Sequence, residues 1–171
     1  MIDIRSFLKN EALIAQLPIA LALVLLVVGG IFLLDRADKQ ARDTTRKHHL
    51  EDLEAALFFA REVNGTYPPY DQPEWCGLLS AKGNEDVKAQ VEAILRQQNQ
   101  KYAVAEKPFP VDPLYGEGEQ GYFYWKHSPA LFELYSVLEI DKNGDRNTTL
   151  CDRAKFMQYD YGLNSAVREN S

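Results

Sequence analysis

The sequence has few of the residues on which metal and catalytic sites most often depend. It contains two cysteines and three histidines, and these do not fall at the spacing of a four-ligand zinc site. No nucleophile-elbow G-x-S-x-G, metalloprotease H-E-x-x-H, phosphate-binding glycine run or dinucleotide-binding fingerprint occurs. The sequence therefore predicts that the protein is not an enzyme.

An excess of positive charge is also lacking. The chain has 19 Lys and Arg residues against 25 Asp and Glu residues, which gives a net charge of -6. An acidic surface repels a phosphate backbone, so we expect no nucleic-acid partner.

What the sequence does contain is a long apolar run from Ala12 to Leu34 without a charged residue. As a helix it would be roughly 34 Å long, enough to cross a hydrocarbon core of about 30 Å. It is longer than the apolar core of a secretory signal peptide and is not followed by a small-residue cleavage step. We predict a short tail over 1–11 and a retained transmembrane helix over 12–34 that contacts membrane lipid.

A helical stalk is predicted to follow over 35–63. Its second half carries apolar residues at three- and four-residue steps, a pattern that favours packing against a domain: Leu50, Leu53, Leu57 and Ala60. The stripe before Leu50 is much weaker, which predicts a solvated stalk there. Gly65 followed by Pro68 is a typical helix stop.

The remaining residues, 64–171, are predicted to form a globular α+β head. A second helix is expected over 85–98 with Asn84 as its N-cap. Residues 67–80 contain three prolines and are interpreted as irregular. Runs rich in aromatic and β-branched residues predict strands within 121–128, 131–140 and 156–165, the first two as an antiparallel hairpin. The fold expected is a long helix whose second half packs on a small antiparallel sheet.

Aromatic residues are concentrated in the expected strands. Because alternate residues of a strand face opposite ways, we expect about half of the following to pack on the helix as core rather than to form a ligand platform: Tyr122, Phe123, Tyr124, Trp125, Phe132 and Tyr135. Tyr70 and Trp75, on the proline-rich segment, are better candidates for a surface contact.

The loop 141–152 is the candidate metal site. It has oxygen-bearing side chains at alternating positions, as calcium requires: Asp141, Asn143, Asp145, Asn147 and Asp152. Its sixth residue is Arg146 rather than the glycine of an EF-hand, so an Asn-Gly turn with solvated carboxylates is the alternative. The two cysteines favour a Cys76–Cys151 disulfide in an oxidising compartment, and two unrelated buried thiols are the alternative.

Several stretches, in their order, resemble the type IV pilins and in particular the major (G-type) pseudopilins of type II secretion. They are RKHHLEDLEAALFFAREVNGTYPPY (46–70), FPVDPLYG (109–116), YFYW (122–125), FELYSVLE (132–139) and YDYGLNS (159–165). The resemblance implies a pilin-like fold and a structural subunit or accessory component of a pilus or pseudopilus. It also implies a single-pass protein of the cytoplasmic membrane with an extracytoplasmic head. Its partners would be other pilin-like subunits, through the N-terminal helix, and the secretion or pilus assembly machinery.

The N-terminal residues depart from the pattern of this family. No glycine precedes Gly29, whereas a family leader ends in glycine, and Arg5 stands where the mature chain would have glutamate if it began at Met1. A count of positive charge on the two flanks of the apolar run would also place the head in the cytoplasm. The alternative interpretation is an unprocessed, membrane-anchored receptor or assembly factor with a pilin fold that does not polymerise.

Overall fold

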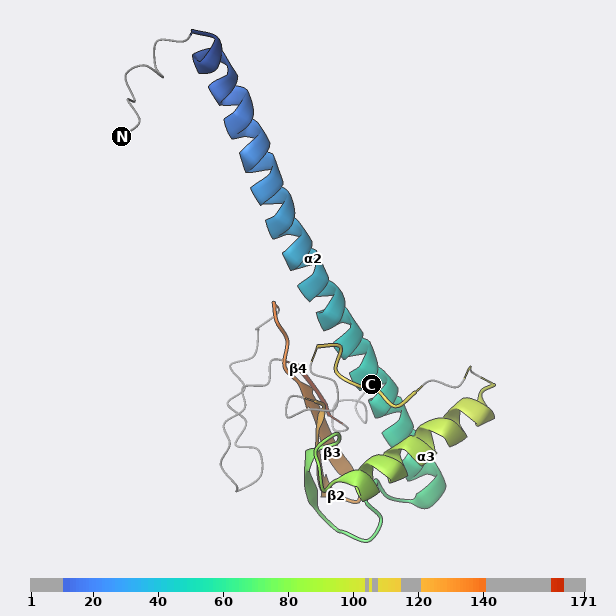
Figure 1. Ribbon diagram of the computed structural model, residues 1–171. Helices are drawn as coiled ribbons and strands as arrows, with labels where there is room; N and C mark the ends of the chain where they lie inside the picture. Colours follow the sequence, from blue (N-terminus) through green and yellow to red (C-terminus); the bar gives the residue numbers. More distant parts are fainter. Residues whose placement is uncertain (1–10, 104, 106–107, 115–120, 141–160, 165–171) are drawn as a thin grey trace. The chain divides into compact units, whose positions relative to one another are not determined.

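The computed structural model describes residues 11–103, 105, 108–114, 121–140 and 161–164. The chain divides into two compact units, Met1–Lys39 and Gln40–Ser171, and each is described by itself. We call the second unit the head. Helix α2 (Glu11–Asn64) contributes residues to both units (Figure 1).

In the first unit, α2 is apolar and open to its surroundings. Its large apolar side chains from Leu17 to Leu34 are 54–73% exposed. The segment is long and apolar enough to cross a membrane, and this coarse part of the sequence prediction is confirmed. After Leu34 the surface of the helix becomes charged, where Lys39 Nζ lies 2.6 Å from Asp35 Oδ2.

The head contains a four-stranded sheet in the order β1-β2-β3-β4, and every neighbouring pair is antiparallel. The strands are β1 (Trp75–Leu78), β2 (Phe123–Ser128), β3 (Leu131–Ser136) and β4 (Tyr161–Asn164). The predicted hairpin is confirmed by β2 and β3, and β4 lies within the third predicted run. Residues 67–80 were predicted to be irregular. This prediction was wrong for Trp75 to Leu78, because these residues pair with the edge of β2 and form β1.

Helix α3 (Glu85–Lys101) is the second helix of the head and confirms the prediction, with one further turn at its end. It begins after Asn84, but this side chain does not cap it. Instead, Asn84 Nδ2 donates to the carbonyl oxygen of Leu78 at 2.8 Å and so ties the start of α3 to the end of β1.

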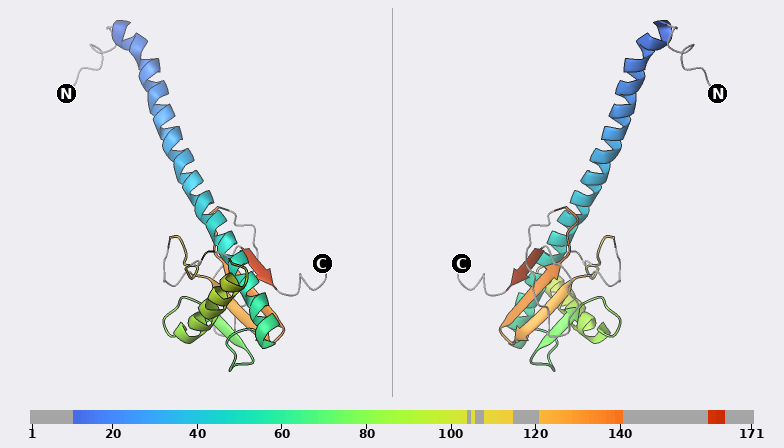
Figure 2. Two further views of the ribbon diagram at one scale, coloured as in Figure 1. Left: turned by 90° about the vertical axis from the view of Figure 1, so that its right-hand side faces the viewer. Right: turned by 90° about the vertical axis from the view of Figure 1, so that its left-hand side faces the viewer.

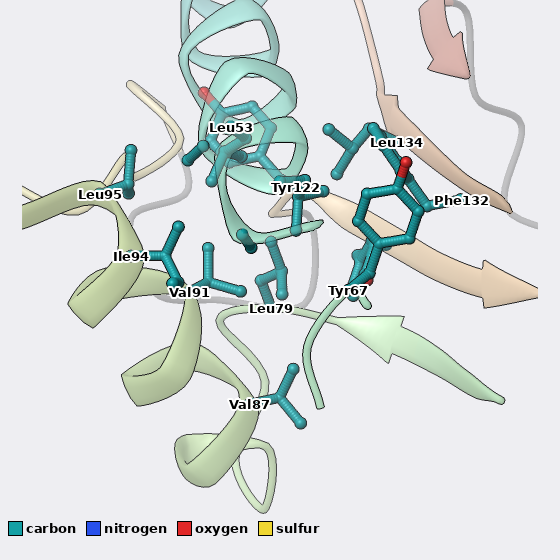
Figure 3. Close-up of a cluster of buried hydrophobic side chains, with 14 of the residues drawn as sticks. Leu53, Tyr67, Leu79, Val87, Val91, Ile94, Leu95, Tyr122, Phe132 and Leu134 are labelled. Carbon is teal, nitrogen blue, oxygen red and sulfur yellow. The ribbon is translucent and has the colours of Figure 1, made fainter. Parts of the chain in front are cut away.

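The core of the head lies between the last turns of α2, helix α3 and one face of the sheet. The left and right views of Figure 2 place the last turns of α2 in front of the strands and behind them, respectively, so the helix covers a face of the sheet. The stripe residues of α2 are at most 1% exposed: Leu50, Leu53, Leu57 and Ala60. Val87, Val91, Ile94 and Leu95 project from α3 into the same cluster as Leu79, and Tyr67, Phe132 and Leu134 lie on the side of the sheet (Figure 3).

Burial of α2 begins earlier than the sequence indicated. The residues before Leu50 were expected to be solvated, but Asp43 is 4% and Arg46 0% exposed. The prediction was wrong here because it was based on apolar periodicity, whereas the contacts made by Asp43 and Arg46 are ionic.

The connection from α2 to β1 is fixed by the sheet. Gly65 ends the helix with φ +75°, and its N–H donates to the Arg61 carbonyl oxygen at 2.8 Å. The buried Lys126 on β2 then donates from Nζ to the carbonyl oxygens of Pro69 and Gln72 at 2.8 and 2.7 Å. Carbonyl groups of an irregular segment are thereby satisfied inside the head.

Candidate functional site

Five charged side chains meet beside residues 42–46 of α2. Arg42, Asp43 and Arg46 come from the helix, Asp112 from a turn, and Glu139 from the chain that leaves β3. We call this group the Arg46 cluster. Arg42 and Asp43 are neighbours in the sequence, and Arg46 follows Asp43 by one helical turn, so the three residues reach one side of the helix.

The guanidinium group of Arg46 is the centre of the cluster. It is completely buried, and it donates to Asp112 from Nε at 2.8 Å and from Nη2 at 3.2 Å. Nη1 donates to Asp43 Oδ1 at 2.8 Å and to Glu139 Oε1 at 2.9 Å. Three carboxylates from separate parts of the chain thus share one cation.

The outer part of the cluster adds a second arginine and two peptide groups. Arg42 donates to both carboxylate oxygens of Glu139, at 2.7 and 2.8 Å. Asp43 accepts hydrogen bonds from the backbone N–H groups of Glu139 and Ile140, each with a shortest distance of 2.9 Å. The helix therefore holds both the side chain and the backbone of this segment.

The two arginines stabilise the ionised form of Glu139. The hydrogen bonds from Arg42 lower the pKa of the Glu139 carboxyl, burial opposes them, and the bonds and charge of Arg46 lower it further, to about 2. For Arg46 itself, burial alone would lower the pKa, but the hydrogen bonds that Arg46 donates to Asp112 and Glu139 outweigh burial and raise it. Arg46 and Glu139 are therefore ionised at neutral pH, which suits a structural tie rather than proton transfer.

A groove of about 610 Å³ lies in the head between α2, α3 and residues 108–111. It is lined by apolar and amide side chains together with His49 and Asp52: Ala55, Leu95, Gln98, Asn99, Tyr102, Pro108, Phe109, Pro110 and Val111. His49 Nδ1 lies 2.6 Å from the hydroxyl of Tyr122. Burial raises the pKa of the Tyr122 hydroxyl, and the negative charge of Asp112 adds to this effect.

The predicted calcium ligands, Asp141, Asn143, Asp145, Asn147 and Asp152, lie outside the described residues. Within the described part of the chain, no group of three or more His, Cys, Asp and Glu side chains is arranged to hold a metal ion. Cys76 is half-buried in β1, and Cys151 lies outside the described residues. The calcium site and the Cys76–Cys151 disulfide therefore remain predictions.

The aromatic residues divide between the two faces of the sheet as strand alternation predicts. Tyr122, Tyr124 and Phe132 lie in the main core, and Phe123 and Tyr135 form a second cluster with which the half-buried Trp125 packs. Trp75, the first residue of β1, is partly buried beside Tyr124, with ring centroids 5.6 Å apart. It therefore belongs more to the core than to the surface.

Tyr70 is 41% exposed, and its hydroxyl accepts a hydrogen bond from Asn64 Nδ2 at 2.9 Å. It keeps an accessible ring, as the surface-contact interpretation requires. The structure therefore separates Tyr70 from Trp75, which the sequence analysis had grouped together.

The Arg46 cluster was not predicted from the sequence. Its signal is faint: an oppositely charged pair three residues apart on a helix, a single Asp112 between two prolines and a Glu139 at the end of an apolar strand run. Only the fold brings these residues together, because Arg46 and Asp112 are 66 positions apart in the chain.

Comparison of the chain with protein-family models, with curated proteins and with solved structures finds no match.

Proposed function

We propose that this protein is a pilin-like structural subunit, or an accessory component, of a type IV pilus or type II secretion pseudopilus. It is held in the cytoplasmic membrane by the apolar part of α2, and its head is extracytoplasmic. Its action is packing: apolar helices of neighbouring subunits associate, and the acidic heads form the outer surface. Calcium bound at 141–152 belongs to this proposal as an accessory feature of the head.

One observation carries the proposal. A single helix, α2, is apolar and exposed from Leu17 to Leu34, and in its last turns it is the central packing element of an α+β head. Contiguous apolar surface of this extent is covered in a functioning protein by lipid or by another protein. A helix that serves both as an anchor and as the core of a head suits a subunit that assembles through its anchor.

The sequence resemblance also supports the proposal. The residues that carry it have structural roles in the head: Gly65 ends α2, Tyr67 is completely buried, and Asp112 binds Arg46. The quoted stretches thus coincide with positions at which the head is held together.

The experiment is fractionation of cells that make the protein. Surface filaments are sheared off, and the filament and membrane fractions are probed for the chain before and after chemical crosslinking. Recovery in the filament fraction, or a ladder of crosslinked multimers in the membrane, is expected. A full-length chain found only in membranes and only as a monomer would overturn the subunit proposal and favour an anchored receptor or assembly factor.

A further inference from the structure

Within the head, the part of α2 after Lys39 is held by two kinds of contact that occupy different turns of the helix. From Leu50 onward the buried residues of the helix, apart from Glu54, belong to the apolar core, together with α3 and the sheet. One turn earlier, the buried residues are Asp43 and Arg46, whose partners are charged side chains and peptide groups. The two sets of contacts are adjacent, but they differ in their chemistry.

The chain that leaves β3 depends on the charged set. Strand β3 ends at Ser136, and the hydrogen bonds from the N–H groups of Glu139 and Ile140 go to the Asp43 carboxylate. The Glu139 side chain is held by Arg42 and Arg46. The Asp43 carboxylate on α2 therefore accepts the backbone hydrogen bonds that the carbonyl groups of a neighbouring strand would accept in a sheet.

The turn at Asp112 is held in the same way. Asp112 Oδ1 accepts a hydrogen bond from the N–H of Leu114 at 2.9 Å, and the same carboxylate accepts two hydrogen bonds from the Arg46 guanidinium group. This turn and the segment after β3 thus share one cation, although they come from distant parts of the sequence.

The energetics favour joint opening of these segments. Asp43, Arg46 and Asp112 are buried, whereas the side chains of Arg42 and Glu139 are 27% and 17% exposed. The Coulomb attraction within the cluster is largely offset by the cost of removing the buried charges from water. If the Asp112 turn or the Glu139–Ile140 segment moves away from α2, charges of the cluster are left buried and unpaired. Hydration of the remaining charged groups then lowers the free energy, so the other segment opens as well. The apolar core keeps most of its buried area in that event, because most of its residues lie on later turns of α2, on α3 and on the sheet, although Phe109 is three residues before Asp112 and the buried Leu138 directly precedes Glu139.

We propose that the Arg46 cluster is a latch: it holds the Asp112 turn and the Glu139–Ile140 segment on α2, and it opens as one unit while the apolar core stays folded. The latch is a conformational device of the head and does not depend on what the apolar part of α2 contacts. Parts of a protein that open locally in this way are detected by hydrogen exchange.

The test is amide hydrogen exchange of the full chain in detergent micelles at neutral pH, with Arg46→Met compared with the unmodified protein. The amides of Leu114, Glu139 and Ile140 are expected to exchange at least about tenfold faster, and those of α3 and of Tyr124 and Leu134 at an unchanged rate. Leu53→Ala serves as the comparison, because it weakens the core and should accelerate exchange throughout the head.

Two results would overturn the latch. One is unchanged exchange at Glu139 and Ile140 in Arg46→Met, and the other is equal acceleration across the whole head. If Arg46→Met does not fold, Asp43→Asn provides the same test, because it keeps the volume and removes the charge that holds the two N–H groups. In that variant the hydrogen exchange of the Leu114 amide must also be faster, although Asp43 does not contact this amide, because the latch opens as one unit.

Discussion

Arg46 and Asp112 form a buried, two-pronged ion pair that joins a helix to a turn 66 positions later in the chain, with 2.8 Å between Nε and Oδ2. Both side chains are at most 2% exposed. A fork of this kind fixes orientation as well as distance, because two parallel N–H groups meet the two oxygens of one carboxylate. The Asp112 turn is thereby aligned on the part of α2 that belongs to the head, one turn before the apolar core begins at Leu50.

The first prediction concerns the coupling between these two residues. Arg46→Met and Asp112→Asn are each expected to destabilise the head, and the double variant should lose less than the sum of the single losses. A coupling energy of about 1–3 kcal/mol is expected for such a contact. It is measured by a double-mutant cycle of urea unfolding with the full chain in detergent micelles.

The matched control is the exposed pair Glu92 and Arg96 on α3, whose side chains are 33% and 57% exposed. Its coupling should be no more than about 0.5 kcal/mol. Equal coupling in the two cycles would contradict the structural role given to the buried pair.

The second prediction concerns pH. The folded state lowers the pKa of Glu139 from 4.5 to about 2, because Arg42 and Arg46 stabilise its charged form. The unfolded chain therefore takes up this proton first, and the stabilisation is present above pH 4.5 and is lost as the pH falls toward 2. Asp43 and Asp112 share Arg46 with Glu139, and Tyr122 beside them stays neutral over this range.

The measurement is the urea midpoint as a function of pH for the unmodified chain and for Glu139→Gln. The variant should be less stable at neutral pH, and its midpoint should fall less steeply between pH 4.5 and 2. Glu51→Gln is the control, because the Glu51 side chain is 55% exposed, and it should leave the profile unchanged. Parallel curves for Glu139→Gln and the unmodified chain would exclude the assigned role of Glu139.

The third prediction concerns the apolar stripe. Leu53 is 0% exposed and lies in the centre of the core, so Leu53→Ala should reduce the free energy of unfolding by about 2–5 kcal/mol. Val63 lies on the same helix but is 48% exposed, so it is the control. Val63→Ala should change the free energy of unfolding by less than about 0.5 kcal/mol. Similar losses at the two positions would show that the last turns of α2 do not pack as described.

The fourth prediction concerns a close approach in the sheet. A Cβ atom at Gly162 of β4 would lie 2.5 Å from Cδ1 of Tyr135 on β3, and Tyr135 is buried. Gly162→Ala should therefore destabilise the head by about 1–3 kcal/mol. In a Tyr135→Leu background the same substitution should cost less, and an equal cost would rule out the ring as the cause.

The sequence allowed good prediction of those elements that have a periodic apolar pattern. Helix α3 and its buried face, from Val87 to Leu95, follow from apolar spacing, as does the stripe from Leu50 to Ala60. The β2–β3 hairpin follows from two aromatic-rich runs with a short turn between them. These patterns are local, so a sequence window contains all the necessary information.

The features that were missed depend on contacts between distant residues. Strand β1 is short and follows three prolines, and it exists because Cys76 and Gly77 pair with Trp125 and Tyr124. The Arg46 cluster has no periodic signature, because each charge by itself resembles a solvated surface residue. Buried ion pairs between distant residues therefore require the fold before they can be recognised.

The measurement that tests the central claim most directly is photo-crosslinking within the membrane of cells that make the protein. A photoreactive residue replaces Leu25, which is 64% exposed in the apolar part of α2, and a second variant carries it at Val63 in the head. The proposed function predicts a ladder of covalent protein multimers from the Leu25 position. Adducts with lipid alone, and no protein multimers from either position, would contradict assembly through the anchor.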